Sequence, residues 1–347
     1  MPLLDISIDV LRTFSTALGA ALALHLSYRL FATIRLYARP SHLRRYLYAD
    51  ASGRQPWALV TGSSDGIGKY LASELASHGF NIVLHGRNPE KLENVRKELQ
   101  IATPNIYFRI IIADASQCHR FGAVDFDDIK RRLADLHLTV LINCAGSGPN
   151  PSFGPLETYS RDQIASVLYL NAVFPTMMTA TLLPLMRGDA PKGNGLTKDK
   201  SGGIPQIQSA TKRPVLIMNI GSVTDAGFPL VSFYSAGKAA AHALHQAVAR
   251  EALLDGSGVE IISHRVGAVT GVSHQRAPAT LFRPHARTLA RAILARTGCG
   301  RKSVIPYWPH ALQQAMLAAT PEWIVDSTIG GALKEEWLIQ KEELRRT

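Results

Sequence analysis

Cysteine is scarce in this 347-residue chain, and the cysteines that it has are not paired. Cys118, Cys144 and Cys299 are widely spaced, with neither the spacing of a metal site nor that of a disulfide framework. We therefore expect a protein of a reducing compartment. The twelve histidines form no HExxH or similar cluster, so we also expect no metal ion.

Acidic residues are few as well. The chain has 27 Asp and Glu against 38 Lys and Arg, a net charge of +11, and only 19% charged residues in all. The low charged fraction excludes a disordered chain, and the length is sufficient for one large domain. The basic balance suits a nucleic acid, an anionic cofactor or a membrane surface. Because the sequence has no stripe of arginines and aromatics, we expect no nucleic-acid partner.

Charge is absent altogether from residues 13–28, near the amino terminus. The segment from Leu11 to Leu36 is long enough to span a bilayer. Aspartates precede it and arginines follow it, so the positive-inside rule leaves the rest of the chain in the cytosol. The alternative is a helix packed on the domain or lying on the membrane. We predict a membrane-anchor helix with a basic linker over residues 1–48, and one domain over 49–347.

A glycine-rich turn follows the first buried strand, Trp57 to Val60. The turn reads Thr61-Gly62-Ser63-Ser64-Asp65-Gly66-Ile67-Gly68, and an amphipathic helix comes next. In a strand–turn–helix unit, glycines let the backbone approach a dinucleotide pyrophosphate, which the helix N-terminus then faces. Buried strands and helices go on alternating, which predicts an α/β fold with a doubly wound, Rossmann-type parallel sheet flanked by helices. The further strands are predicted at 81–85, 106–112, 139–142, 215–220, 259–265 and 303–306.

The end of the second strand favours NADP(H) over NAD(H). An NAD site usually has a carboxylate here for the ribose 2′-hydroxyl, whereas this chain has Arg87, a cation for a 2′-phosphate. Arg87 could also be a solvated arginine at a helix start. Asp114 ends the third strand, where it could accept a hydrogen bond from the adenine amine or cap the following segment.

Tyr234 and Lys238 are four residues apart and would share one face of a helix. A phenol has a pKa near 10, so it needs a nearby cation to work as an acid or base at neutral pH. Lys238 would supply that cation. Two further segments lack periodicity: residues 187–213, predicted as a flexible insertion, and 272–285, predicted as a substrate lid.

These motifs, in this order, resemble the short-chain dehydrogenase/reductase family from about Trp57 to Pro306. The family's glycine motif falls on Thr61–Gly68, and its Asn-Asn-Ala-Gly motif falls on Asn143–Gly146. Its helix asparagine falls on Asn171 and its catalytic serine on Ser222. Its Tyr-x-x-x-Lys motif falls on Tyr234 and Lys238. The match of Asn171 counts residues 187–213 as an insertion.

The resemblance implies a catalytic set of Asn171, Ser222, Tyr234 and Lys238. Tyr234 would donate a proton to a substrate oxygen, which Ser222 would orient by a hydrogen bond. Lys238 would lower the Tyr234 pKa and hold the nicotinamide ribose, and Asn171 would hold a water linking Lys238 to solvent. The expected NADP(H)-binding residues are Val60, Gly62, Ser64, Asp65, Gly66, Ile67, Gly68, Arg87, Asp114, Asn143, Tyr234, Lys238 and Val269.

Two positions depart from the family pattern. Cys144 stands where the second Asn is expected, and we interpret it as a small packing residue. After the strand at 259–265 the family's proline is replaced by Val266, and its threonine is displaced by one residue, to Thr270. We therefore expect the backbone of Val269, rather than Thr270, to contact the nicotinamide.

Within the family, the apolar N-terminal segment and the stretch from Trp57 to Lys69 look like very-long-chain 3-oxoacyl-CoA reductases and related 17β-hydroxysteroid dehydrogenases. That likeness implies an endoplasmic-reticulum enzyme that uses NADPH on a lipophilic substrate. The alternatives are a reductase or dehydrogenase for a steroid, terpenoid or polyketide, and a non-catalytic NADP(H)-binding membrane protein. A homodimer through the long helices is a further expectation. The apolar residues near Trp308 and Trp323 are either core or an edge that dips into the membrane.

Overall fold

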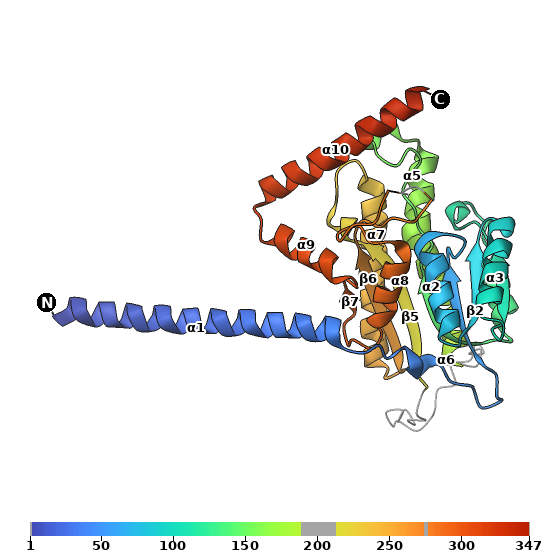
Figure 1. Ribbon diagram of the computed structural model, residues 1–347, viewed down its shortest axis with the longest axis horizontal. Coiled ribbons are helices and arrows are strands. Elements are labelled where there is room, and N and C mark those ends of the chain that lie inside the picture. Colours follow the sequence, from blue (N-terminus) through green and yellow to red (C-terminus); the bar gives the residue numbers. More distant parts are fainter. Residues whose placement is uncertain (1, 189–212, 274–276, 347) are drawn as a thin grey trace, which may run out of the picture. The chain divides into compact units, whose positions relative to one another are not determined.

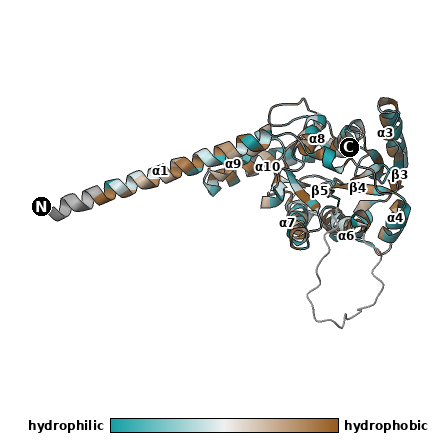
Figure 2. Ribbon diagram, turned by 90° about the horizontal axis from the view of Figure 1, so that it is seen from below, coloured by the Kyte–Doolittle hydropathy of each residue, from teal (hydrophilic) through white to brown (hydrophobic). Residues whose placement is uncertain are grey.

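The computed structural model describes residues 2–188, 213–273 and 277–346, which fall into two compact units, Met1–Ser41 and His42–Thr347. The first unit is a single long helix, α1 (Pro2–Ala38). Its stretch Val10–Ala38 is long and apolar enough to cross a membrane, and none of its most apolar window is buried. Figure 2 shows hydrophobic residues, in brown, along this helix. A second stretch of that length and composition, Arg161–Arg187, is partly buried in the second unit, as a core helix of a folded domain would be.

The second unit is built on a seven-stranded sheet. In chain order its strands are β1 (Pro56–Thr61), β2 (Asn81–Gly86), β3 (Phe108–Ile112), β4 (His137–Asn143), β5 (Val215–Ser222), β6 (Val259–Val266) and β7 (Ser303–Val304). All strand pairs are parallel, in the spatial order β3-β2-β1-β4-β5-β6-β7. The order reverses between β1 and β4, and the crevice at such a switch point is where this kind of sheet binds its ligands. The predicted fold class is confirmed.

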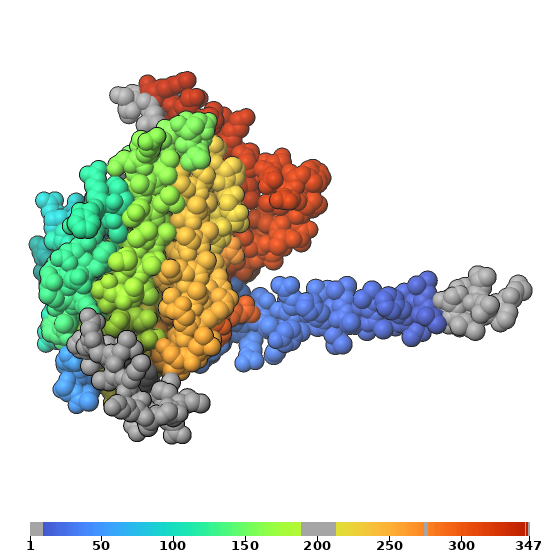
Figure 3. Space-filling view, turned by 180° about the vertical axis from the view of Figure 1, so that it is seen from behind, coloured from blue at the N-terminus to red at the C-terminus, as the bar shows by residue number. Residues whose placement is uncertain are grey.

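Helices cover both faces of the sheet, so its central strands are apolar on both sides. One face carries α2 (Gly66–Ser77), α3 (Pro89–Ala102) and α8 (Ala286–Ala295) (Figure 1). The other carries α4 (Phe126–Leu133), α5 (Arg161–Leu168), α6 (Phe174–Arg187) and α7 (Ser232–Leu254). Figure 3 shows this face, on which α5 and α6 follow one another end to end. Leu59, Leu141 and Ile217 are fully buried between these layers. Each such side chain contributes about 1.5–3 kcal/mol by leaving water.

Short helical turns fill the connections: η1 (Leu43–Tyr46), η2 (Ala115–Gln117), η3 (Leu156–Thr158), the π-helical turn η4 (Tyr169–Val173) and η5 (Val223–Ala226). Of these, η1 belongs to the second unit. The buried Tyr46 hydroxyl donates to Glu260 Oε2 at 2.5 Å, and the His42 backbone N–H donates to the Thr297 carbonyl at 3.1 Å. The compact unit therefore begins at His42 rather than at residue 49.

The chain ends in two helices, α9 (Trp308–Ala318) and α10 (Glu322–Arg346). Figure 1 shows α9 beyond the β7 edge of the sheet and α10 running from there past the end of α5. Gln340 of α10 accepts hydrogen bonds from the backbone N–H groups of Ser152 and Phe153. The predicted insertion, 187–213, lies outside the described residues apart from its ends, and so do residues 274–276 of the predicted lid.

Candidate active site

The glycine turn between β1 and α2 needs glycine at two positions for reasons visible in the structure. Gly62 has φ +67°, and a Cβ on it would lie 2.8 Å from the Ala145 Cα. A Cβ on Gly68 would lie 2.3 Å from the Gly62 carbonyl oxygen. Any side chain would push the turn away from α2 or from the loop after β4. The turn therefore presents bare backbone at the N-terminus of α2, the geometry in which a helix binds a phosphate group.

The other predicted residues of the turn differ in exposure. Val60 is fully buried within β1, Ser64 and Ile67 are partly exposed, and Asp65 is exposed. The segment that follows β6 crosses this turn. Asp65 Oδ2 accepts from the Ser273 backbone N–H at 3.0 Å, and a Cβ on Gly66 would lie 2.9 Å from the Val272 side chain. The first residues of the predicted lid are thus attached to the glycine turn.

The ends of β2 and β3 carry the predicted adenosine-side residues. Arg87 is exposed directly after β2, and among the described residues no ion pair involves it. Asn88 next to it caps α3 by accepting from the Lys91 N–H. Asp114 Oδ1 accepts from both the backbone N–H and the hydroxyl of Ser116, so the capping alternative for Asp114 is the one that the structure shows.

Asn143, at the end of β4, points away from the glycine turn. Its Nδ2 donates to Thr179 Oγ1 at 2.9 Å and to the Pro175 carbonyl at 3.3 Å, and the side chain is buried. It therefore ties β4 to α6, which the sequence alone had not indicated. The loop after β4 is tied to β1 by Thr61, whose Oγ1 accepts from the backbone N–H groups of Cys144 and Ala145.

Ser222 and Tyr234 meet at the carboxyl end of the sheet. Ser222 ends β5 and Tyr234 lies in the first turn of α7. Burial raises the pKa of the Tyr234 phenol above its ordinary value, and a hydrogen bond with Ser222 lowers that pKa by a smaller amount. The phenol is thus protonated at neutral pH. Lys238 contributes no resolved part of this shift, so the expectation that it lowers the Tyr234 pKa together with the positive nicotinamide of the oxidised cofactor stays a prediction.

Lys238 is buried one turn along α7. Its Nζ donates to the Ile220 carbonyl at 3.0 Å and lies 5.8 Å from the centre of the Tyr234 ring. Burial lowers the Lys238 pKa to about 8. Burial also raises the pKa of the nearby Cys144 thiol to about 12, which agrees with the interpretation of Cys144 as a packing residue.

Asn171 joins this group through an irregularity that the sequence did not predict. Between α5 and α6 the chain widens into the π-helical turn η4, which contains Asn171. Such bulges in helices are frequent at functional sites. Asn171 Nδ2 donates to the carbonyls of Ser147 and Val167. Its Oδ1 is buried and accepts no hydrogen bond from the described residues.

Gly146 is the point on which Asn171 and Lys238 converge. A Cβ on Gly146 would lie 2.7 Å from Asn171 Oδ1 and 2.7 Å from Lys238 Nζ. On the other side of Asn171, a Cβ on Gly237 would lie 3.1 Å from the Asn171 Cβ. Two glycines thus make room for the amide beside the ammonium group. The unpaired Asn171 Oδ1 is placed to hold a water next to Lys238.

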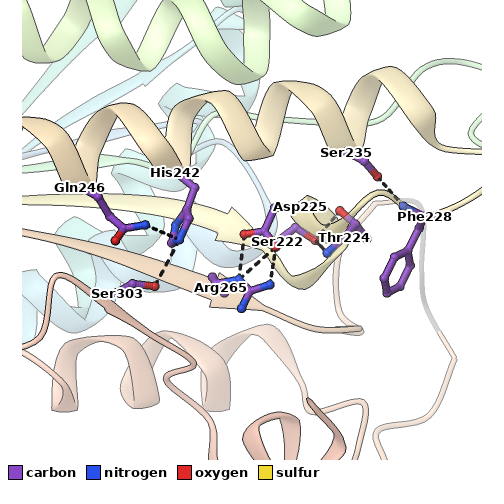
Figure 4. A network of polar contacts seen from close by, with 9 residues as sticks. All are labelled: Ser222, Thr224, Asp225, Phe228, Ser235, His242, Gln246, Arg265 and Ser303. Carbon is purple, nitrogen blue, oxygen red and sulfur yellow. Dashed lines mark hydrogen bonds and ion pairs between the residues drawn. The ribbon is translucent and has the colours of Figure 1, made fainter. Parts of the chain in front are cut away.

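A polar network that we did not predict supports Ser222 (Figure 4). Ser222 Oγ accepts from the backbone N–H and the hydroxyl of Thr224, at 3.2 and 2.9 Å. Asp225 follows in η5 and forms a bidentate ion pair with Arg265 of β6. The pair fixes η5, and therefore Ser222, to the neighbouring strand. Two charged residues forty positions apart give no sequence signal of this contact.

The segment after β6 holds the last predicted contact. Val269 is partly exposed, whereas Thr270 is buried and its hydroxyl donates to the Ala277 carbonyl. Thr270 is thus engaged within its own loop, consistent with the preference for Val269. A pocket of about 520 Å³ opens beside this end of the sheet, between the η5–α7 loop and α10. It is lined by Gly227, Phe228, Pro229, Ser232, Asp326 and Gly330.

The site can therefore hold a dinucleotide along the glycine turn, with Ser222, Tyr234 and Lys238 at its far end. Comparison with known proteins agrees with this geometry. The short chain dehydrogenase family matches residues 56–279. The very-long-chain 3-oxoacyl-CoA reductase of Pyricularia oryzae is 27% identical, over 90% of this chain and 85% of its own. Hydroxysteroid dehydrogenase-like protein 1 of Gallus gallus is 28% identical, over 87% and 82%.

Among solved structures, a short-chain dehydrogenase from Sphingobium yanoikuyae in complex with NADPH has the same fold. It superposes with a TM-score of 0.56 at 23% identity, covering 76% of this chain and 92% of its own. The family match, the parallel sheet and the glycine turn agree on one assignment. This chain belongs to the short chain dehydrogenase family, whose members are oxidoreductases acting on a CH–OH or C=O group.

Proposed function

We propose that this protein is an NADP(H)-dependent reductase of a carbonyl in a lipophilic substrate, of the 3-oxoacyl-CoA type. The observation that carries the proposal is the convergence of Asn171 and Lys238 on Gly146, beside the Ser222–Tyr234 pair. A protein that only binds a dinucleotide has no need of this set. This argues against a non-catalytic role.

The residues for the cofactor are those of the glycine turn with Arg87. Because Gly62 and Gly68 leave no room for a Cβ, the turn backbone offers its N–H groups to a pyrophosphate. The guanidinium of Arg87, which no other described residue pairs with, would pair with a 2′-phosphate, for which a planar, permanent cation is well suited. NADPH, when bound there, supplies the hydride.

Tyr234 acts as the general acid in this proposal. Its pKa is raised by burial, so the phenol keeps its proton until negative charge develops on the substrate oxygen. Ser222 donates a hydrogen bond to the same oxygen and orients the carbonyl. Its own acceptor sites are occupied by Thr224, which leaves its hydroxyl proton directed elsewhere.

Lys238 and Asn171 return the proton that Tyr234 gives up. With a pKa of about 8, Lys238 is mostly protonated at neutral pH and can exchange its proton easily. The unpaired Asn171 Oδ1 would hold a water beside the ammonium group and so connect it to solvent. This is the role we expected for Asn171 from the family likeness, with the π-helical turn as its structural means.

The substrate class is proposed from the relatives and from the pocket. Several relatives are named very-long-chain 3-oxoacyl-CoA reductases, and they match most of this chain. The pocket beside the η5–α7 loop is lined in part by the apolar side chains of Phe228 and Pro229, which would suit a lipophilic substrate. The hydroxysteroid dehydrogenase-like relative favours a second candidate, a reductase or dehydrogenase for a steroid or another polycyclic ketone.

For location we propose the endoplasmic-reticulum membrane, with α1 as the anchor and the second unit in the cytosol. Support comes from the length and apolar composition of Val10–Ala38 and from the arginines that follow it.

A direct test uses membranes that carry the full chain. NADPH consumption would be measured with 3-oxoacyl-CoAs of increasing length, steroid ketones and polyketide ketones, and repeated with NADH. Faster consumption with long 3-oxoacyl-CoAs and NADPH supports the first candidate, and faster consumption with steroid ketones supports the second. Consumption that no carbonyl compound stimulates would refute both.

A further inference from the structure

Helix α9 has an apolar face that the described residues of the second unit leave about half exposed. Trp308, Leu312 and Met316 follow one another at helical spacing, so their side chains form one stripe along the helix. They are 50%, 45% and 61% exposed. Trp323, at the start of α10, is 73% exposed. A stripe of large apolar side chains held in water is unfavourable, and an exposed patch of this kind usually marks a binding surface.

Charge is absent from the stretch of sequence that contains α9. From residue 303 to residue 321 the sequence has no Asp, Glu, Lys or Arg. The nearest charged residues in sequence are Lys302 before it and Glu322 after it. The core of a protein interface is poor in charged residues, and a helix in the interfacial layer of a bilayer places tryptophan and leucine on its apolar face.

The opposite face of α9 is fixed to the catalytic unit, so the stripe cannot simply turn inward. His310 is buried, and its Nδ1 accepts from the Gly267 backbone N–H at 3.1 Å. Its Nε2 donates to the Phe282 carbonyl at 3.2 Å. A Cβ on Gly267 would lie 3.0 Å from the His310 ring, so the contact is close. The helix is therefore attached both to the loop after β6 and to the described part of the predicted lid.

The covalent chain keeps His42, the first residue of the second unit, near any membrane that holds α1. Helix α1 ends at Ala38 and the second unit begins at His42, a separation of at most about 14 Å along the chain. The His42 backbone N–H donates a hydrogen bond to the carbonyl of Thr297, which precedes β7 and α9 in sequence. Basic residues accompany this edge: Arg44 and Arg45 on η1 and Arg301 before β7 are exposed. Such cations favour an anionic lipid surface.

We propose that the outer face of α9, with Trp323, inserts into the interfacial layer of the bilayer in which α1 is anchored. Trp308 and Trp323 would lie at the level of the head groups, where tryptophan is enriched in membrane proteins. Leu312 and Met316 would reach the acyl-chain boundary. The catalytic unit is then held in a defined orientation on the membrane instead of hanging from α1 alone.

The test uses the full chain in single-copy nanodiscs containing phosphatidylcholine and phosphatidylserine, with or without bromine on the acyl chains. Brominated lipid quenches a tryptophan only where the two are in contact. We expect quenching in the wild-type chain and loss of most of it in the W308F/W323F double variant. The matched control is W337F, because Trp337 lies fourteen residues, about 21 Å, farther along α10 than Trp323 and beside Lys341. This control should keep the quenching of the wild type.

Equal quenching in the wild type and the double variant would overturn the proposal, as would no quenching in the wild type. A second copy of the chain on the α9 face is tested by the single-copy format. The same measurement is therefore made in nanodiscs that hold two copies of the chain. If Trp308 is quenched in single-copy nanodiscs but not in two-copy nanodiscs, the face prefers a protein partner and the proposal fails. NADPH binding by each variant, measured in parallel, shows that the fold is retained. Since the readout is fluorescence, its result does not depend on the proposed reaction.

Discussion

Lys238 Nζ lies 5.8 Å from the centre of the Tyr234 ring and donates to the Ile220 carbonyl rather than to the phenol. The two side chains share one helix face, yet both are affected mainly by burial, which raises the Tyr234 pKa and lowers the Lys238 pKa. Each group is therefore pushed toward its neutral form. The buried lysine destabilises the folded protein, but it places a proton source next to the phenol.

Replacing Lys238 by Met should stabilise the protein while destroying activity. A Lys238 pKa lowered from 10.5 to about 8 means that the folded state penalises the cation, by about 3 kcal/mol at most. The unfolded chain binds the extra proton between pH 8 and 10.5, so the wild type gains stability from this group as the pH rises through that window. The gain in unfolding free energy of Lys238→Met over the wild type should be full below pH 8 and vanish near pH 10.5. Thermal unfolding in detergent at several pH values measures it, and an advantage that does not change with pH would contradict the burial argument.

Gly146→Ala should impair catalysis by displacing both Asn171 Oδ1 and Lys238 Nζ, each 2.7 Å from the new methyl group. Misplacement of catalytic groups by about 1 Å costs roughly a hundredfold in rate. Gly148→Ala is the matched control, because a Cβ there would meet only the Ser152 carbonyl, at 4.0 Å. We expect a large fall in kcat for the first variant and little change for the second. Equal kcat values would show that Gly146 is not needed for space.

Arg87→Asp should change the cofactor preference. The new carboxylate repels a 2′-phosphate and can accept from a 2′-hydroxyl, so NADPH affinity should fall by about tenfold or more while NADH affinity holds or improves. Lys97→Asp makes the same charge change on an exposed residue farther along α3, and it should not alter the ratio. The measurement is the dissociation constant of each variant for NADPH and for NADH. Equal losses of affinity for both cofactors in Arg87→Asp would refute the assignment of Arg87 to the 2′-phosphate.

The Asp225–Arg265 pair should act as a unit that positions Ser222. Arg265→Met leaves the Asp225 carboxylate, which is only 7% exposed, without its partner, and this should cost about 3 kcal/mol of stability. Asp225→Leu combined with Arg265→Met should recover much of that loss, while kcat stays low because η5 is no longer attached to β6. Stability and kcat recovering together would mean that the pair serves the fold alone.

Much of the fold followed from local patterns: buried strands, the glycine turn, and the order in which Ser222, Tyr234 and Lys238 occur. These features depend on neighbours in sequence or on chain order, which a parallel sheet converts directly into position. The π-helical turn at Asn171 did not follow, because Asn171 packs against Gly146 and Gly237, which only the folded chain brings together. The side-chain direction of Asn143 and the bond of Tyr46 to Glu260 also depend on distant partners.

The central claim is that Tyr234 is the proton donor of an NADP(H)-dependent carbonyl reduction. The most direct measurement compares wild type and Tyr234→Phe for NADPH binding and for single-turnover reduction of a long-chain 3-oxoacyl-CoA in the same membranes. Removal of one hydroxyl should leave NADPH affinity near the wild-type value and slow the chemical step by about 10²–10⁴-fold. Turnover by Tyr234→Phe at the wild-type rate would contradict the account.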